Sequence, residues 1–544
     1  MLNIHQKFCK ETFYDGQLVG FEPVYKKDFN FAYDVIDAIA EAEPLRRAML
    51  WCNESGEEHT FTFSDISKAS NRAANFFASL GIGRGDRVML ILKRHYQFWF
   101  ALLGLHKLGA VGIPATNQLT KKDIAYRCNA AGVKAVICTT DGDVAEHVDA
   151  AMSESPTVSI NISVHGAYKN WINFDAEYLK FSDTMNRVKT HAVDPMLIYF
   201  TSGTTGMPKM VCHDFSYPIA HIVTAKYWQH VVPDGLHLTI SDTGWMKSMW
   251  GKLYGQWFME AGIFVCDFDR FHAPEILQLF SKYQITTFCA PPTMYRFFIK
   301  EDLSQYDLSS LTYACIAGEP LNPEVFNQFY KATGLKLMEG FGQSETTLVL
   351  FNPVGTEPKP GSTGRPNPAY QVDLVDANGD SVPPGTVGEI VIRTPGKKPA
   401  GLFNGYYLDD DRTKNVWHDG IYHTGDTAWQ DEDGYFWYIG RNDDIIKSSG
   451  YRIGPFEIES VLMEHPAVLE CAITGVPDPV RGQVVKATIV LAKGYEASEE
   501  LKKELQNYVK KQTAPYKYPR IIDFVTELPK TISGKVRRVE IRGV

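Results

Sequence analysis

Apolar runs rich in β-branched residues alternate with helical patterns along the first 440 residues. Arg87–Leu92, Ala135–Thr140 and Met196–Phe200 have the length and composition of buried strands. Between them, Ser67–Leu80 and Gln97–Leu108 repeat apolar residues at every third or fourth position, as helices do. Strand–helix alternation of this kind predicts an α/β fold with mostly parallel sheets covered by helices.

The pattern changes after about residue 370. Gln371–Val375 and Gly388–Ile392 are strand-like and flank a turn-forming segment, so they predict a hairpin. Thr427–Gln430 and Tyr435–Ile439 predict a second hairpin. A smaller β-rich region is therefore expected to follow the α/β part.

The last hundred residues have the pattern of a compact α+β unit. Helices are predicted at Pro455–His465 and Ser498–Lys511, and strands at Ala472–Val476, Val484–Val490 and Arg520–Val525. The chain has 544 residues, and a typical domain of ~150 residues gives three to four domain-sized units.

Composition excludes several classes of protein. With 44% hydrophobic and 22% charged residues, the chain is neither a disordered regulator nor a fibre. Its net charge of −9 argues against a nucleic-acid binder held by overall positive charge. The nine cysteines form no CxxC pair, so we expect neither a disulfide framework nor a zinc site, and a reducing compartment.

No targeting or membrane segment is apparent in the sequence. Met1–Gly20 is polar and has no apolar h-region or small-residue cleavage site. The most hydrophobic window, Phe98–Pro114, is interrupted by His106 and Lys107 and is too short to span a bilayer. These features predict a soluble, cytoplasmic protein.

The C-terminal tail differs in charge from the rest of the chain. Lys510–Val544 holds nine Lys or Arg residues and three Asp or Glu residues. A local positive cluster suits an anionic ligand such as a nucleotide. A solvated surface is the alternative that charge alone leaves open.

The strongest local motif is Thr201–Lys209, with the sequence TSGTTGMPK, directly after a predicted strand. Its glycines, hydroxyl groups and lysine can turn hydrogen-bond donors toward phosphate oxygens. The glycine spacing and the residue after the lysine differ from those of a P-loop. A flexible surface turn is the alternative.

This segment closely resembles the signature loop of the adenylate-forming superfamily, which includes acyl-CoA synthetases, peptide-synthetase adenylation domains and firefly-type luciferases. Five further family-like motifs follow in order: Gly318–Pro320, Gly340–Glu345, Tyr422–Asp426, Gly440–Asp444 and Pro529–Lys535. Lys447–Pro455 and Ala514–Arg520 resemble the medium-chain acyl-CoA synthetase branch.

The resemblance implies an AMP-forming acid–thiol ligase that makes acyl-CoA through acyl-AMP. It implies an N-terminal domain over residues 1–442, with a β-rich subdomain at about 365–442. A mobile C-terminal domain would then cover residues 443–544 and rotate about a hinge at Asp443 between the two half-reactions.

The resemblance also assigns the nucleotide site. Lys535 would bridge the substrate carboxylate and the α-phosphate, Glu345 would hold Mg²⁺, and Ser344 would contact the α-phosphate or acyl carboxylate. Phe341 would stack on adenine, and Asp426 would bind the ribose hydroxyls. The complete ATP/AMP set is Thr201, Ser202, Gly203, Thr204, Thr205, Gly206, Met207, Pro208, Lys209, Gly318, Glu319, Pro320, Glu339, Gly340, Phe341, Gly342, Gln343, Ser344, Asp426, Arg441, Arg452 and Lys535.

The CoA and acyl sites follow from the same resemblance. Positions matching CoA contacts are Gln118, Ser449, Gly450, Tyr451, Arg481, Lys510, Tyr518, Pro519 and Arg520. The acyl pocket is expected to include Trp245, Met246, Trp250, Gly318, Gly342 and Val349. Gly342 stands where acetyl-specific relatives have a tryptophan that blocks the pocket, so medium-chain, branched and aryl acids all remain possible substrates.

Two other activities fit the same motifs. The acyl group could be passed to the phosphopantetheine of a carrier protein, although no carrier domain adjoins this chain. A luciferase-like oxygenase, or a non-catalytic nucleotide-binding regulator, is the further alternative. The expected partners are a carboxylic acid, ATP with Mg²⁺, and CoA, without nucleic acid or an integral membrane segment. The oligomeric state, monomer or homodimer, stays open.

Overall fold

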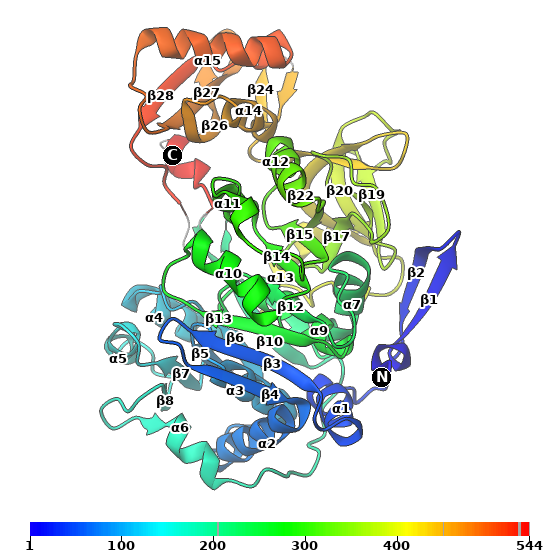
Figure 1. Cartoon of the computed structure of the whole chain (residues 1–544), viewed down its shortest axis with the longest axis vertical. Helices are drawn as coiled ribbons and strands as arrows, with labels where there is room; N and C mark the ends of the chain where they lie inside the picture. The colour runs from blue at the N-terminus through cyan, green and yellow to red at the C-terminus, as the bar shows by residue number, and fades with distance from the viewer. Residues whose placement is uncertain (204–205, 450, 531–534, 543–544) are drawn as a thin grey trace.

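A computed structural model describes residues 1–203, 206–449, 451–530 and 535–542 of the chain. Its N-terminal part is built on two large sheets, and a short two-stranded ribbon projects from one side (Figure 1). That ribbon pairs β1 (Cys9–Tyr14) with β2 (Gln17–Pro23).

The first large sheet has seven strands in the order β11-β10-β6-β5-β7-β8-β9. The pairs β6–β5, β5–β7, β7–β8 and β8–β9 are parallel, and β10–β11 is an antiparallel hairpin. Its strands are β5 (Arg87–Ile91), β6 (Val111–Pro114), β7 (Ala135–Thr139), β8 (Ile160–Val164), β9 (Ile172–Asn173), β10 (Pro195–Gly203) and β11 (Gly206–Asp214).

The second large sheet has nine strands in the order β18-β17-β16-β15-β14-β12-β13-β3-β4. Its central pairs are parallel, whereas both edges are antiparallel. Its strands are β3 (Arg47–Asn53), β4 (Glu58–Thr62), β12 (Leu236–Thr239), β13 (Gly262–Asp267), β14 (Thr287–Ala290), β15 (Tyr313–Ala317), β16 (Leu337–Gly342), β17 (Leu348–Phe351) and β18 (Arg365–Pro366).

Two smaller sheets follow. The first joins β19 (Gln371–Val375), β20 (Gly388–Arg393), β21 (Trp417–His418), β22 (Ile421–Gln430) and β23 (Phe436–Arg441). The second joins β24 (Ile446–Ser448), β25 (Tyr451–Ile453), β26 (Val468–Asp478), β27 (Gly482–Leu491) and β28 (Ile521–Val525), and forms a separate cap with two helices (Figure 1). Both predicted hairpins, β19–β20 and β22–β23, are antiparallel pairs in the structure.

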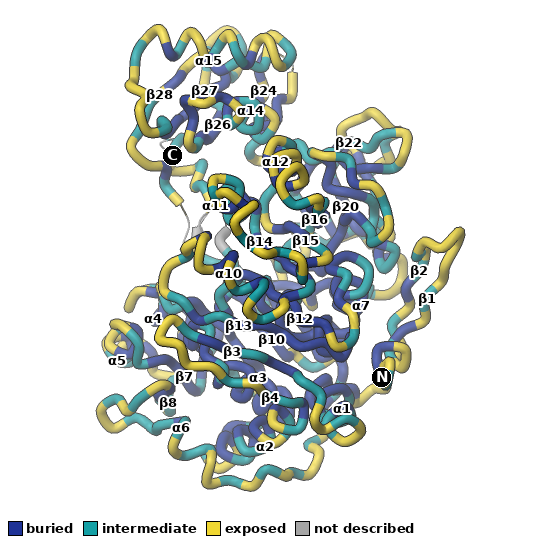
Figure 2. Tube along the Cα trace, in the orientation of Figure 1, coloured by how far each residue is buried: buried dark blue, intermediate teal, exposed yellow. Residues whose placement is uncertain are grey.

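Helices cover the sheets. They are α1 (Ala38–Ala42), α2 (Phe63–Ser79), α3 (Gln97–Leu108), α4 (Lys121–Ala131), α5 (Val144–Met152), α6 (Phe174–Glu177), α7 (Tyr217–Val223), α8 (Met246–Gly251), α9 (Tyr254–Phe258), α10 (Ala273–Tyr283), α11 (Pro292–Phe298), α12 (Pro323–Thr333), α13 (Asp410–Val416), α14 (Pro455–Met463), α15 (Glu499–Gln512) and α16 (Arg538–Arg542). All twelve residues of α3 are buried, because it lies in the main core (Figure 2).

Local sequence signals explain where helices begin and end. Thr62 and Asp65 form a capping box at the start of α2, which satisfies the unpaired N–H groups there. Gly109 ends α3 with a φ of 73°, a conformation that favours glycine. None of the described helices is both long and apolar enough to cross a bilayer. The predicted mixed α/β fold with a β-rich part is confirmed.

Candidate functional site

The predicted phosphate loop is the tip of the hairpin formed by β10 and β11. We expected the loop to start after Phe200, but β10 continues to Gly203 and Thr201 pairs with Lys209 across the hairpin. Thr204 and Thr205 lie outside the described residues, as does the side chain of Ser202. The two strands place the ends of the motif at fixed positions beside each other.

Lys209 belongs to a cluster that also contains Tyr406 and Glu345. The Tyr406 hydroxyl donates to Glu345 Oε1 at 2.8 Å and accepts from Lys209 Nζ at 3.1 Å. Lys209 Nζ lies 3.6 Å from the same Glu345 oxygen. Burial and the Glu345 charge raise the pKa of Tyr406, so its hydroxyl keeps its proton. A buried carboxylate is thus held beside the ammonium group of the phosphate motif.

Asp426 is the centre of a second cluster. Its Oδ1 accepts from the Tyr438 hydroxyl at 2.9 Å, and its Oδ2 accepts from Gln343 Nε2. Arg441 Nη1 lies 3.6 Å from Oδ2. Burial raises the pKa of Asp426 to about 6, although the charge of Arg441 and both hydrogen bonds act in the opposite direction. Tyr422 completes the cluster by donating to Gln343 Oε1 at 2.7 Å.

The segment from Glu339 to Glu345 connects these two clusters. Phe341 is half-buried, and its ring lies 5.9 Å from that of Tyr438, so the expected adenine and ribose contacts adjoin. The carbonyl of Ser344 is 2.7 Å from Nε2 of His213. Burial raises the pKa of Glu339, whose Oε2 accepts from the Leu321 N–H, so Glu339 supports the backbone from inside the core.

The Gly318–Pro320 motif follows β15 and lies against α8 and α11. Lys247 Nζ donates to the carbonyl of Ala317 at 2.8 Å. Glu319 Oε2 accepts from the Thr293 hydroxyl at 3.3 Å. Gly318 has a φ of 113°, and no neighbouring atom lies within 4 Å of the position that a Cβ would take, so the backbone is open there.

Lys535 is exposed, and its charge reaches the nucleotide cluster. The Lys535 ammonium opposes the effect of burial on the pKa of Asp426. It also adds to the effect of burial in lowering the pKa of Lys247. Lys535 is therefore within electrostatic range of both Asp426 and Lys247. Arg452 is exposed on β25.

The expected acyl residues divide between two hydrophobic clusters. Met246 lies in the main core cluster, against which Trp250 packs, and the Trp250 ring lies 5.6 Å from that of Trp228. Val349 packs instead, with its neighbour Leu350, in the cluster of the β-rich part. Leu348 and Phe351, which we did not predict, are the β17 residues in the cluster with Met246.

Two further expected acyl residues have distinct surroundings. Trp245 is half-buried and directly precedes α8. A Cβ at Gly342 would lie 2.5 Å from the Thr347 carbonyl oxygen. The glycine is thus required by close backbone approach, and a tryptophan at this position would force the backbone to move.

Several expected CoA residues lie in the C-terminal part, on α15 and in the segments that precede β27 and β28. Lys510 Nζ lies 4.0 Å from the Tyr518 ring centroid, and Arg520 Nη1 donates to the Tyr518 hydroxyl at 2.7 Å. Backbone N–H groups that bind the Asp478 carboxylate are the main cause of its lowered pKa, and the charges of Arg481 and Arg520 lower that pKa further. Both arginines are therefore close enough to act on the same carboxylate. Pro519 is buried beside them.

Of the remaining expected CoA residues, Tyr451 lies on β25 and Ser449 directly follows β24, also in the C-terminal part. The Tyr451 ring stacks on that of Tyr516 at 4.0 Å. The Ser449 N–H donates to the Arg481 carbonyl at 2.9 Å, and Gly450 lies outside the described residues. Gln118 is exposed near the end of β6, in the N-terminal part.

Asp443, the expected hinge, lies in the short link between β23 and β24. It is exposed, and its Oδ1 is 3.5 Å from Arg441 Nε. The next residue, Asp444, forms ion pairs with Arg538 and Arg542 of α16. Asp443 therefore contacts the β-rich sheet, whereas the next residue, Asp444, contacts α16.

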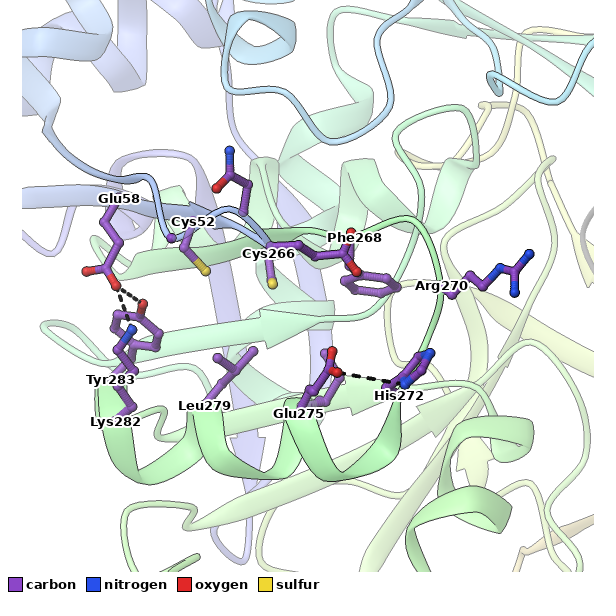
Figure 3. Close-up of a pocket in the computed structure, with 14 residues that line it drawn as sticks. Cys52, Glu58, Cys266, Phe268, Arg270, His272, Glu275, Leu279, Lys282 and Tyr283 are labelled. Atoms are coloured by element: carbon purple, nitrogen blue, oxygen red, sulfur yellow. Dashed lines mark hydrogen bonds and ion pairs between the residues drawn. The ribbon is translucent and has the colours of Figure 1, made fainter. Parts of the chain in front are cut away.

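A surface pocket of about 130 Å³ lies apart from all these residues. Figure 3 shows Cys52 and Cys266 on neighbouring strands, facing side chains of α10 such as Leu279 and Tyr283. None of the residues expected from the motifs lines it. The pocket is therefore not the site that the motifs build.

Sequence reasoning missed several polar residues of the site: Tyr406, Tyr438, Lys247 and His213. Each has its partner more than ten residues away in the chain, as with Tyr406 and Glu345. Tyr438 offered a weak signal in the sequence. It stands two residues before the Gly440–Asp444 motif, on the strand that pairs with the strand of Asp426.

Comparisons with known proteins agree with this geometry. The family model described as AMP-binding enzyme matches residues 36–407, and that described as AMP-binding enzyme C-terminal domain matches residues 457–535. Acyl-coenzyme A synthetase ACSM3, mitochondrial, of Mus musculus is 43% identical over 97% of this chain and 93% of its own length. The human ACSM5 protein of the same kind is 42% identical over 94% and 90%.

Solved structures are similar along nearly the whole chain. The anthranilate CoA ligase AuaEII in complex with anthranoyl-AMP has a TM-score of 0.87 and 27% identity, covering 95% of this chain and 98% of that one. A benzoate CoA ligase from Burkholderia xenovorans LB400 has a TM-score of 0.81 and 25% identity, covering 94% and 100%.

The comparisons contradict one expectation. The relatives in mouse, rat and human are named as mitochondrial proteins. The cytoplasmic location expected from the sequence is therefore wrong. The polar character of Met1–Gly20 was too weak a signal to decide a compartment.

Proposed function

Because the chain belongs to the AMP-binding enzyme family, we propose that it is an ATP-dependent acyl-CoA synthetase. It joins a medium-chain, branched or aryl carboxylic acid to CoA and releases AMP and pyrophosphate. The observation that carries the proposal is the pair of buried clusters joined by Gly340–Glu345, one with a carboxylate beside the phosphate motif and one with a carboxylate suited to ribose.

The reaction needs two transfers. In the first, a carboxylate oxygen attacks the α-phosphorus of ATP, the bond to pyrophosphate breaks, and acyl-AMP forms. In the second, the CoA sulfur attacks the acyl carbon, AMP leaves, and the thiol proton is lost to solvent. Activation is required because a carboxylate oxygen is a poor leaving group.

We assign the phosphate end to the hairpin and its cluster. Lys209 and the backbone N–H groups of the Thr201–Lys209 motif bind the β- and γ-phosphates. Glu345 offers the hard oxygen ligand that Mg²⁺ prefers, and Mg²⁺ takes most other ligands from phosphates and water. When bound, Mg²⁺ would neutralise part of the phosphate charge. Tyr406 orients the Glu345 carboxylate and bridges it to Lys209, whose Nζ also lies 3.6 Å from Glu345 Oε1.

We assign the nucleoside end to Asp426 and Phe341. Asp426 accepts hydrogen bonds from the ribose hydroxyls, and Phe341 stacks on adenine next to Tyr438. We assign to Lys535 the stabilisation of the charge that shifts between the carboxylate and the α-phosphate, because its charge acts on Asp426.

We propose that residues 1–442 and 443–544 act as two domains with a hinge at Asp443. Rotation would replace Lys535 at the site by the segment around Ser449 and Tyr451, and would open a path for CoA. The cluster of Arg481, Lys510 and Arg520 is suited to the CoA phosphates. Domain rotation lets one site serve both transfers.

A carboxylate panel tests this function. Purified protein with ATP, Mg²⁺ and CoA should release AMP and pyrophosphate in equal amounts when a suitable medium-chain or aryl acid is present. Acetate should be a poor substrate. Omission of CoA should allow pyrophosphate exchange but not continuous AMP release. Failure of every acid to give AMP would refute the proposal.

A further inference from the structure

Two histidines and an aspartate meet at one end of the seven-stranded sheet, and none of them is assigned to the proposed reaction. His95 follows β5, Asp141 follows β7, and His165 follows β8. These strands are parallel and adjacent in the order β5-β7-β8, so their carboxyl ends lie side by side (Figure 1). Ligand sites in parallel sheets occur at such ends.

The three side chains present their coordinating atoms to one another. His165 Nδ1 is 2.7 Å from Asp141 Oδ1, and His95 Nε2 is 3.4 Å from Asp141 Oδ2. One atom from each residue lies within 4.8 Å of the other two. Ligands of a tetrahedral zinc ion with bonds of about 2.0 Å stand about 3.3 Å apart. The two histidine nitrogens contact different oxygens of Asp141, so small side-chain rotations would bring one oxygen and both nitrogens to that spacing.

The surroundings of His95 favour metal binding. Its Nδ1 is 2.7 Å from Oδ2 of Asp267, at the end of β13 in the other large sheet. Metal-ligating histidines characteristically donate their second nitrogen to a carboxylate, which fixes the ring and the tautomer. His95 is buried, so this orientation is set by the fold.

His165 is held in position by its backbone. Its φ of 67° lies in the left-handed region, which non-glycine residues rarely adopt. The His165 N–H donates to Asp175 at 2.7 Å, and its carbonyl accepts from the Thr140 hydroxyl at 2.9 Å. These bonds aim the ring at Asp141, although the residue is exposed to solvent.

Charges in the cluster leave room for a cation. The carboxylates of Asp141, Asp267 and Asp269 face the cations Lys93 and Arg94. With neutral imidazoles, the carboxylates outnumber the cations. Lys93 Nζ is 3.2 Å from Asp141 but 2.8 Å from Asp269, so it keeps a partner when Asp141 turns an oxygen to a metal ion.

We propose that His95, Asp141 and His165 form a binding site for a divalent transition metal of the zinc class. Two imidazole nitrogens and one carboxylate oxygen suit Zn²⁺ or Co²⁺ rather than Mg²⁺, which prefers oxygen ligands. Water completes the coordination. The ion ties together the segments after β5, β7 and β8 and, through Asp267, the second large sheet. The site is independent of the ligase reaction.

Metal titration of the full-length protein tests the site. After dialysis against a chelator, Zn²⁺ titrated calorimetrically should bind at one equivalent with a micromolar or lower Kd and should raise the melting temperature. Co²⁺ should give the intense visible absorption of a tetrahedral complex.

Two variants make the test specific. His165→Asn keeps a residue that tolerates a left-handed backbone but removes the imidazole, and should weaken Zn²⁺ binding at least 10-fold and abolish the Co²⁺ band. His147→Asn is the control, because His147 is a similarly exposed histidine that pairs with Asp143 on α5. It should bind like the wild type.

The proposal is overturned if the wild type shows no saturable binding of one equivalent. It is also overturned if His165→Asn binds Zn²⁺ as tightly as the wild type, because the ion would then sit on other surface groups. Acyl-CoA formation should be equal in His165→Asn and the wild type, so this test fails or succeeds separately from the proposed function.

Discussion

At the scale of single residues, Asp426 combines a functional role with a cost in stability. Its carboxylate is buried and its pKa is raised to about 6, whereas an aspartate in an unfolded chain titrates near ~3.9. Tyr438, Gln343 and Arg441 reduce the penalty of burial without removing it. The geometry keeps a charged acceptor where ribose hydroxyls would donate.

The pH dependence of stability follows from this raised pKa. The folded protein binds more protons at Asp426 than the unfolded chain between about pH 4 and 6, so this group's stabilising contribution is lost as the pH rises through that range. Asp426→Asn cannot ionise. The free energy of unfolding of Asp426→Asn, relative to that of the wild type, should therefore increase between pH 4.5 and pH 7, by at most about 3 kcal/mol.

Thermal unfolding at the two pH values measures this difference. The same variant should lose about 10- to 100-fold in kcat/KM for ATP, because hydrogen bonds to a charged acceptor are lost. Exposed Asp376→Asn is the control and should change neither quantity. An Asp426→Asn protein with normal ATP kinetics would separate Asp426 from ribose binding.

Tyr406 is a positioning residue between Lys209 and Glu345. Tyr406→Phe removes the hydroxyl that donates to Glu345 and accepts from Lys209. The existing 3.6 Å ion pair between Lys209 and Glu345 should then become closer, which lowers the availability of Glu345 to Mg²⁺. We expect kcat/KM for MgATP to fall about 10-fold, the loss of one hydrogen bond to a charged group, and the Mg²⁺ concentration for half-maximal rate to rise.

The matched control is Tyr330→Phe, at an exposed tyrosine of α12. Kinetics at varied Mg²⁺ separate positioning from simple destabilisation, since a purely structural change would lower the rate equally at every Mg²⁺ concentration. A Tyr406→Phe enzyme with wild-type Mg²⁺ dependence would contradict the assigned role.

Trp250 tests the acyl pocket better than Gly342, where added side-chain atoms would meet the Thr347 carbonyl. Trp250 packs on Trp228 next to the cluster that contains Met246. Trp250→Ala should enlarge this side of the acyl pocket and shift the substrate preference toward longer or bulkier acids. Each additional buried methylene contributes ~0.8 kcal/mol, or about 4-fold.

Relative kcat/KM across a series of acids measures that shift. Trp437→Ala is the control, since Trp437 stacks on Trp429 in the β-rich sheet and its loss should leave the acid preference unchanged. An unaltered chain-length profile in Trp250→Ala would place the pocket elsewhere.

At the scale of elements, the sequence predicted those helices and strands that short stretches of residues determine. Gln97–Leu108 was predicted as a helix and is α3. The apolar run and the glycine that ends it, Gly109, lie within one short stretch of sequence. The order of strands in the nine-stranded sheet could not be predicted, because β3 pairs with β13, more than two hundred residues later. The same holds for the site, where motifs gave Glu345 but not its partner Tyr406.

The phosphate motif shows a second limit. Thr201–Lys209 contains glycines and a proline, which favour a loop, yet Thr201 and Lys209 pair within a hairpin. Tertiary contacts at Pro208, whose carbonyl accepts from Tyr126, extend the strand beyond its local preference. Sequence therefore predicted the chemistry of this segment better than its conformation.

The link between β23 and β24 carries the prediction at this scale. Asp443→Pro fixes one backbone dihedral in the link and should slow rotation of the C-terminal domain. Acyl-AMP formation, measured by ATP–pyrophosphate exchange, should stay within about 3-fold of the wild type, whereas conversion of added acyl-AMP to acyl-CoA should fall by more than about 10-fold.

Asp443→Ala, which removes the same side chain without fixing the backbone, is the control and should retain both half-reactions. Equal loss of both half-reactions in Asp443→Pro, with normal behaviour of Asp443→Ala, would indicate a local distortion rather than a hinge.

At the scale of the whole molecule, charge and architecture divide the work. The chain is acidic overall, whereas the tail from Lys510 onward is basic. The C-terminal sheet forms a separate cap (Figure 1) and contacts the N-terminal part through bonds such as that from Asn322 Nδ2 to the Ser460 carbonyl, at 3.1 Å. Such an interface is compatible with a cap that moves during the reaction.

The central claim is that the cap supplies Lys535 for acyl-AMP formation and withdraws it for thioester formation. The most direct test is to measure both half-reactions in Lys535→Ala. Lys530→Ala is the control, because Lys530 lies on the same tail and pairs with Glu470 at 2.8 Å.

We predict that Lys535→Ala loses about 10²- to 10³-fold in carboxylate-dependent ATP–pyrophosphate exchange, while added acyl-AMP is converted to acyl-CoA at close to the wild-type rate. Loss of both half-reactions by the same factor, with Lys530→Ala unaffected, would contradict the account.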